Sequence, residues 1–326
     1  MTLENVTSNQ HFVSRVEQKL NALNPNAAVR KLKIYSFRVV DRANYTLQLE
    51  SPSGQSIGNN MALSDLFSFD VDGSGLRLNF ESLFKQYEDT IETHTRSLLA
   101  KLDAGKSDIK DEIIGLFASK LLNFVRNPYS IRKMLNTFPV LSNLPPTDPT
   151  QLRYYQRILD GRKPHQAHLC KQLGISDKDY IEWLRAIFIL LMRGIPGRPN
   201  IFEGIIKGLF ENKKTQAGAI ICTYSNDHCL VCDRGFTQAI PDGPTLNFSF
   251  NLCSNAFIHY NFTNFSAKFS DRFSQEVITM LENRPEVTVS VSRAHDRMDM
   301  LGPFNQRAID QCHERVYSSR KTGLVL

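Results

Sequence analysis

Long apolar runs, a secretion signal and a dense set of cysteines are all missing from this chain of 326 residues. The longest apolar run, 186–192, ends at Arg193 and falls well short of the ~18–20 residues of a membrane span, so we expect no membrane partner. The N-terminus has neither a basic segment nor an apolar segment behind it, which predicts a cytoplasmic protein. Six cysteines are too sparse for a disulfide scaffold, and we expect them to be thiols.

Familiar catalytic and nucleotide-binding motifs are also absent. The sequence has no phosphate-binding glycine loop, no dinucleotide fingerprint, no His-Glu-x-x-His pair and no Gly-x-Ser-x-Gly elbow. Cys229 and Cys232 have the spacing of half a zinc site, but no second pair supplies the other half. Residues three apart on a strand also point to opposite faces. We therefore expect buried thiols and no zinc here.

What the chain does contain is the composition of an ordinary folded protein. Hydrophobic residues make up 41% and charged residues 22%, which excludes collagen, coiled-coil arrays and wholesale disorder. The 39 Lys and Arg against 33 Asp and Glu give a net charge of +6. Such a charge permits contact with phosphates but is weaker than a nucleic-acid signature.

The N-terminal segments predict a hairpin followed by two long helices. Residues 33–40 and 45–50 are β-prone and flank a turn. Apolar residues recur at steps of three, four and seven over 79–102 and again over 107–125, as on the buried face of a helix. Ser107 is the expected N-cap of the second helix, which should end before Asn127-Pro128.

Helical periodicity resumes over 152–191 and stops at a segment rich in proline and glycine, 194–200. This segment divides the chain into two predicted regions. Residues 1–196 contain the hairpin and the helices, and residues 197–326 are mainly β with two helices. The two regions can equally form one continuous domain.

The last third is dominated by β-prone segments. Residues 219–224 and 229–232 have a hairpin pattern. Further strands are expected at 246–252, 257–262 and 287–291, and helices at 270–282 and 304–317. The predicted fold class is therefore α+β, with an N-terminal β-hairpin, a central helical bundle and a C-terminal mainly antiparallel sheet with closing helices.

A few polar residues are candidates for chemistry, although each has a simpler interpretation. Glu81 and Glu88 lie seven residues apart on one helix face, ~10 Å apart along its axis, and could bind a divalent metal or simply face solvent. Arg126 ends its helix, where a cation is favoured by the helix dipole. His11 precedes any regular element and by default is exposed or hydrogen-bonded.

Short motifs spread over nearly the whole chain carry a family resemblance. They are His11-Phe12-Val13, 34–37, 65–69, Glu81 with Glu88, Arg126-Asn127-Pro128, Cys232-Asp233, 248–252, Asn305 and 315–318. With these motifs the chain resembles the bacterial family catalogued as domain of unknown function 4238. Its members tend to open with a His-aromatic-Val motif and later enter a helix that bears two glutamates.

The resemblance implies an anti-phage role, because relatives occur among bacterial defence genes. If His11, Glu81, Glu88, Arg126 and Asp233 converge, they suit metal-assisted phosphodiester hydrolysis. Glu81, Glu88 and Asp233 would then be metal ligands for Mg or Mn, His11 an acid or base, and Arg126 a phosphate clamp.

This interpretation describes a defence effector that acts on nucleic acid as a metal-dependent nuclease. The alternative is a non-enzymatic sensor that binds a phage product, such as a phage protein, and uses the polar residues to lock its fold. An open concavity lined by the five residues would favour the nuclease. Mutual pairing away from solvent would favour the binding protein.

Overall fold

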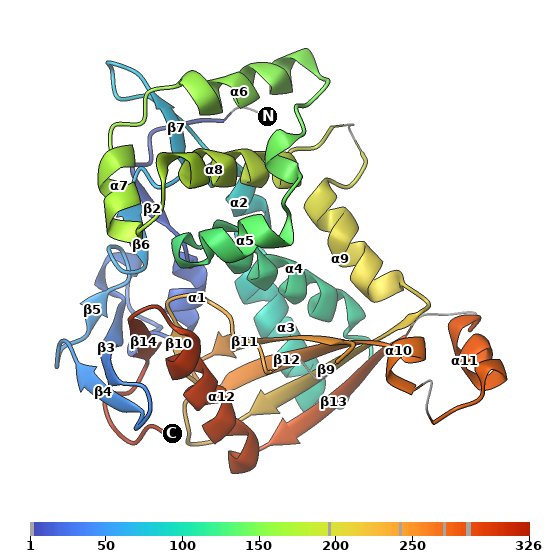
Figure 1. The fold of residues 1–326 in the computed structure, drawn as a ribbon. Helices are drawn as coiled ribbons and strands as arrows, with labels where there is room; N and C mark the ends of the chain where they lie inside the picture. The colour runs from blue at the N-terminus through green and yellow to red at the C-terminus, as the bar shows by residue number, and fades with distance from the viewer. Residues whose placement is uncertain (1–2, 195–196, 241–242, 270–271, 285–287) are drawn as a thin grey trace.

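The predicted α+β fold class is confirmed. The computed structural model describes residues 3–194, 197–240, 243–269, 272–284 and 288–326, with 42% helix and 23% strand. Figure 1 shows α3 and α4 beside the strands of the C-terminal sheet, with α6 at the far end of the molecule from α12.

Short strands and one long strand form the N-terminal region. β3 and β4 form the predicted antiparallel hairpin, in which Phe37 pairs with Leu49. The sheet order β10-β14-β3-β4 places two strands from the C-terminal region beside this hairpin. The strands are β1 (Glu4–Asn5), β2 (Asn9–His11), β3 (Lys33–Asp41), β4 (Thr46–Leu49), β5 (Gln55–Ser56), β6 (Ala62–Ser64), β7 (Ser68–Val71) and β8 (Arg77–Asn79).

The helices pack as a bundle in the middle of the chain, as expected. The α-helices up to the punctuated segment are α1 (Arg15–Leu20), α2 (Glu81–Glu88), α3 (Ile91–Asp103), α4 (Lys110–Arg126), α5 (Ile131–Thr137), α6 (Pro149–Asp160), α7 (Gln166–Leu173) and α8 (Asp177–Leu191), followed by α9 (Ile201–Glu211). Short 3-10 helices lie in the connections: η1 (Val29–Lys31) between α1 and β3, η2 (Pro128–Ser130) between α4 and α5, and η3 (Leu141–Asn143) between α5 and α6. The N-cap of α4 is Ile109 rather than Ser107, so the predicted cap is wrong.

The single helix predicted over 79–102 is wrong, because α2 and α3 are separate helices. The Tyr87 carbonyl accepts hydrogen bonds from the Thr90 hydroxyl at 2.9 Å and from the Ser119 hydroxyl at 2.8 Å. In an unbroken helix this carbonyl would accept from the amide four residues later. Hydroxyl groups that compete for a backbone acceptor interrupt the helix here.

The C-terminal sheet has the order β11-β12-β9-β13. Its strands are β9 (Thr215–Thr223), β11 (Thr245–Cys253), β12 (Ala256–Asn264) and β13 (Val289–His295). The predicted strands 246–252 and 257–262 pair antiparallel, whereas β13 runs parallel to β9. α10 (Phe265–Phe269) and α11 (Gln275–Glu282) follow β12 and protrude beyond the end of the sheet (Figure 1). Residues 270–271 of the helix predicted over 270–282 lie outside the described residues. The same holds for residue 287 of the strand predicted over 287–291.

Two local predictions in this region are wrong. β10 (Val231–Cys232) does not form a hairpin with 219–224 but pairs with β14 (Arg315–Ser318). The helix predicted over 304–317 is α12 (Met298–Gln311), which starts earlier and ends before β14. The chain after α12 turns because Asp233 binds its backbone amides, as described below.

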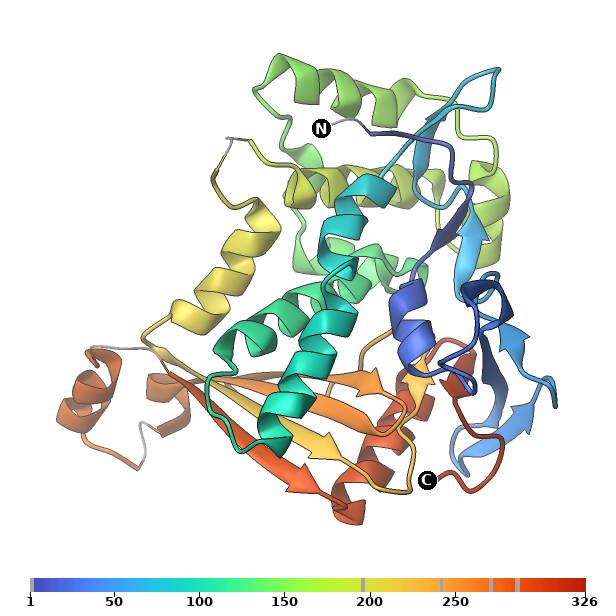
Figure 2. The same ribbon diagram turned by 180° about the vertical axis from the view of Figure 1, so that it is seen from behind.

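The two faces of the C-terminal sheet have different coverings. On one face the Phe117 ring of α4 lies 4.9 Å from the Tyr260 ring and 5.1 Å from the Phe262 ring, measured between centroids. On the other face the Phe304 ring of α12 stacks on Phe257 at 4.1 Å. Figure 2 shows α3 in front of the sheet and α12 behind it. One buried cluster contains residues from both sides of the predicted boundary, among them Leu3 and Tyr317.

All six cysteines are free thiols, and the Cys232 thiol donates to the Phe236 carbonyl at 3.2 Å. Within the described parts of the chain, no helix is both long enough and apolar enough to cross a membrane.

Candidate functional site

Arg126 joins α4 to α2 through Glu88. The Arg126 side chain is 1% exposed, and its Nη1 donates to the Glu88 carboxylate. Nη2 donates to Asn123 Oδ1 at 3.3 Å, and the guanidinium carbon lies 5.2 Å from the centre of the Phe84 ring. A cation so enclosed and paired is held mainly by the fold itself.

Glu81, at the start of α2, is the least satisfied of the predicted residues. Burial, and after it repulsion from Glu88, raises the pKa of Glu81 to about 7, although the charge of Arg126 opposes the rise. Its Oε1 is buried and has no hydrogen-bond partner in the described parts of the chain. Glu81 can therefore change its protonation state near neutral pH.

His11 ends β2 and is held by a backbone contact. Its Nε2 lies 3.2 Å from the Ile57 carbonyl, so this nitrogen carries the proton and donates it. Burial, helped by the charges of Arg15 and Arg126, lowers the pKa of His11 to about 4, although the hydrogen bond to the Ile57 carbonyl opposes the fall. His11 is thus neutral near pH 7, within electrostatic range of Arg126 and not in bulk solvent.

The environment of the Asp233 carboxylate differs from that of Glu81 and Glu88. Its carboxylate accepts backbone N–H groups of His313 at 2.6 Å, Glu314 at 2.8 Å and Arg315 at 2.9 Å. Burial raises the pKa of Asp233, and these three hydrogen bonds oppose that rise. The carboxylate therefore closes the turn between α12 and β14, which is a structural task.

Four of the five predicted residues thus share a neighbourhood, and Asp233 does not join them as a ligand. Among the described residues, no group of three or more His, Cys, Asp or Glu side chains is arranged to hold a metal ion. Glu81, Glu88 and Asp233 do not form the expected donor set for Mg or Mn, and we derive no step through a metal. Their catalytic and metal-binding roles stay predictions.

Residues that the sequence did not single out extend the Arg126 contact into a buried network. Lys120 and Glu17, 0% and 3% exposed, form an ion pair of 2.7 Å. Asn123 donates to the same carboxylate at 2.9 Å and accepts from Arg126. Lys120, Asn123 and Arg126 recur every three residues in the last part of α4, where the residues between them are apolar, and that pattern is the signal in the sequence.

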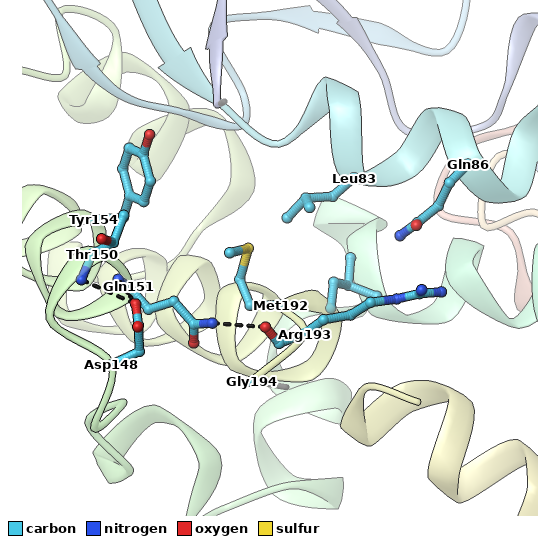
Figure 3. Close-up of a pocket in the computed structure, with 10 residues that line it drawn as sticks. Leu83, Gln86, Asp148, Thr150, Gln151, Tyr154, Met192, Arg193 and Gly194 are labelled. Carbon is cyan, nitrogen blue, oxygen red and sulfur yellow. Dashed lines mark hydrogen bonds between the residues drawn. The ribbon is translucent and has the colours of Figure 1, made fainter. Parts of the chain in front are cut away.

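The cavity between α2, α6 and α8 does not coincide with the predicted site. Figure 3 shows a cavity of about 400 Å³ between α2, α6 and the end of α8, lined by apolar Leu83 and Met192 and by Arg193. None of the five predicted residues lines it. Gln151 donates to the Arg193 carbonyl across this cavity at 2.7 Å. Asp233 lines a smaller cavity of about 230 Å³, but its carboxylate is already engaged.

No family model, curated protein or solved structure matches this chain. The resemblance to the family called domain of unknown function 4238 therefore stays a prediction.

Proposed function

We propose that the protein is a non-enzymatic binding protein of bacterial phage defence, with nucleic acid or a phage protein as its partner. The defence context comes from the resemblance. The observation that carries the binding role is the enclosure of Arg126: it is 1% exposed, paired with Glu88 and packed on Phe84. A phosphate clamp must present its guanidinium to the substrate, and this one faces protein groups.

The engagement of Asp233 supports the same proposal. A carboxylate that already accepts three backbone N–H groups would have to release them to bind a metal. Removing those hydrogen bonds would open the turn that places β14 beside β3. We infer that the residues expected to be catalytic maintain the packing of α2, α4 and β14.

The test is Glu88→Gln, with melting temperature and phage protection measured on the same protein. Loss of one partner of a buried ion pair costs up to about 3–5 kcal/mol; Glu88 is 23% exposed, so we expect the lower end. A structural role predicts a melting temperature lower by several degrees. An unchanged melting temperature together with lost protection would contradict the proposal.

The metal-dependent nuclease remains a second candidate because of Glu81 alone. A carboxyl group with a pKa of about 7 suits general acid or base catalysis at neutral pH. This candidate predicts cleavage of an oligonucleotide in Mg or Mn, abolished by Glu81→Gln without loss of stability. Absence of cleavage in wild-type protein under either metal would leave only the binding role.

A further inference from the structure

The loop after β10 lines a cavity of about 510 Å³ with residues from α5 and α12. In Figure 1 this loop passes between α5 and α12. The charged residues of the lining are Lys133 from α5, Arg234 from the loop and Asp310 from α12. The cavity lies apart from Glu81, Glu88 and Arg126, none of which contributes to it.

Arg234 is a partly buried cation that forms no ion pair with any residue that the structure describes. Its Nε is buried and has no hydrogen-bond acceptor in the described parts of the chain, as is also true of Arg126 Nε. Arg126, however, is paired with Glu88, whereas no carboxylate among the described residues lies within ion-pair distance of the Arg234 guanidinium. A buried guanidinium N–H that lacks an acceptor costs free energy. An anionic ligand would supply the missing acceptor.

Lys133 places a second positive charge beside the first. Its Nζ lies 5.6 Å from the centre of the Phe236 ring and 6.0 Å from that of Phe124, and it donates to Gln238 Oε1. Burial lowers the pKa of Lys133, and the charge of Arg234 lowers it further. Two neighbouring cations repel each other, and an anion bound between them would attract both and so offset that repulsion.

The site is held rigid by two glutamines. The Gln238 backbone amide donates to Gln311 Oε1 at 2.9 Å, and Gln311 Nε2 donates back to the Gln238 carbonyl at 2.5 Å. Gln238 Nε2 also reaches the Asn247 carbonyl of β11 at 3.3 Å. Because Gln238 is fixed to both α12 and β11, the Lys133 ammonium that it accepts from is fixed too, and binding needs little reordering.

The positive charge continues along α12. Arg307 lies one turn before Gln311, on the same helix face. Its Nε is buried without a partner among the described residues, and burial lowers its pKa. Asp310 is an exposed carboxylate at the rim of the cavity and forms no ion pair with Lys133 or Arg234 within the described residues. Two cations and one carboxylate therefore line the cavity itself, and Arg307 adds a third positive charge on the helix that supplies Gln311.

We infer that Lys133 and Arg234 form a phosphate-binding site, with Arg307 extending it toward the neighbouring phosphate of a nucleic acid. This assignment rests on the proposed binding function and names its ligand class. A planar guanidinium next to an ammonium matches the oxygens of a phosphate group. The open cavity exceeds the size of a single phosphate, as binding along a polymer backbone requires.

The test uses fluorescence anisotropy with a fluorescein-labelled oligonucleotide and the full chain. Arg234→Met and Lys133→Met should each weaken binding roughly ten- to hundred-fold. Each should also reduce the slope of log affinity against log salt by about one. Arg153→Met removes the same charge from exposed α6, at the far end of the molecule (Figures 1 and 2), and should change neither quantity appreciably.

Competition with inorganic pyrophosphate and with a mononucleotide separates the possible sources of the phosphate. If either compound displaces the labelled oligonucleotide at low concentration, and Arg234→Met no longer binds that compound, the ligand is a free phosphate compound. Binding of the oligonucleotide alone identifies the polymer backbone. Both outcomes support a phosphate site.

Unaltered oligonucleotide affinity in Arg234→Met and Lys133→Met would overturn the site, as would no binding of any of the three probes. Neither result bears on whether Glu88 and Arg126 are structural. Conversely, metal-dependent cleavage that needs Glu81 would end the non-enzymatic proposal and leave the phosphate site standing.

Discussion

Two charged regions of this protein differ in how completely their charges are matched. Between α1, α2 and α4, Lys120 pairs with Glu17 and Arg126 with Glu88. Between α5 and α12, Lys133 and Arg234 face the same cavity without a carboxylate partner among the described residues. Burial is deeper in the first region, where Lys120 is 0% and Arg126 1% exposed.

This difference distinguishes charges that stabilise the fold from charges that can bind a ligand. A buried cation that is matched within the chain offers nothing to a ligand, and breaking its pair leaves an uncompensated charge. A partly buried cation without a match is already mostly desolvated and can gain from an anion. The first region contains the residues expected to be catalytic from the family resemblance, whereas the second contains the unmatched cations that favour ligand binding.

The largest effect should come from Lys120→Met, which leaves Glu17 buried without its ion-pair partner. We expect a loss of about 3–5 kcal/mol in the free energy of unfolding, measured by urea denaturation. Lys110→Met, on an exposed position of the same helix, should change it by less than about 0.5 kcal/mol.

The double variant Lys120→Met with Glu17→Gln sharpens this test. Removing both charges should recover part of the loss, because no unpaired charge is left buried. Additive losses in the double variant would mean that the two residues act independently and would contradict the ion-pair account.

The next effect is a pH dependence with opposite signs at Glu81 and His11. The pKa of Glu81 rises from 4.5 to about 7 on folding, so its contribution is fully present below pH 4.5 and is lost as the pH rises through 7. The pKa of His11 falls from 6.5 to about 4, so its contribution is present above pH 6.5 and is lost as the pH falls through 4. In wild-type protein these two trends largely cancel.

Single variants should expose each trend, by up to about 3 kcal/mol. Glu81→Gln should make the protein more stable as the pH rises from 4 to 6.5. His11→Asn should make it less stable as the pH rises from 4.5 to 7. Denaturant titrations across this range measure both, and parallel profiles for the two variants would refute the assigned shifts.

Local chemistry accounts for what the sequence predicted correctly. The β3–β4 hairpin follows from β-prone runs around a turn, where Asp41 accepts from the Ala43 and Asn44 amides at 2.9 and 3.2 Å. The end of α4 follows from Pro128, which keeps Asn127 extended. Both features depend only on neighbours in the chain.

Contacts between distant segments explain the failures. α2 and α3 separate because Ser119 of α4 reaches the Tyr87 carbonyl, which no periodicity of 79–102 reveals. α12 gives way to β14 because Asp233, 80–82 residues earlier, binds its following amides. The seven-residue spacing correctly placed Glu81 and Glu88 on one helix. The Glu17–Lys120 pair joins residues 103 positions apart, so local sequence patterns cannot predict it.

The most direct test of the account compares Arg126→Met with Arg234→Met, because each removes one guanidinium and leaves a similar apolar side chain. Melting temperature and oligonucleotide affinity are measured on both purified proteins. For Arg126→Met we expect a melting temperature lower by several degrees, with unchanged affinity of the folded protein. For Arg234→Met we expect an unchanged melting temperature with at least a roughly tenfold weaker affinity. The reverse pattern, with affinity lost in Arg126→Met and retained in Arg234→Met, would contradict the account.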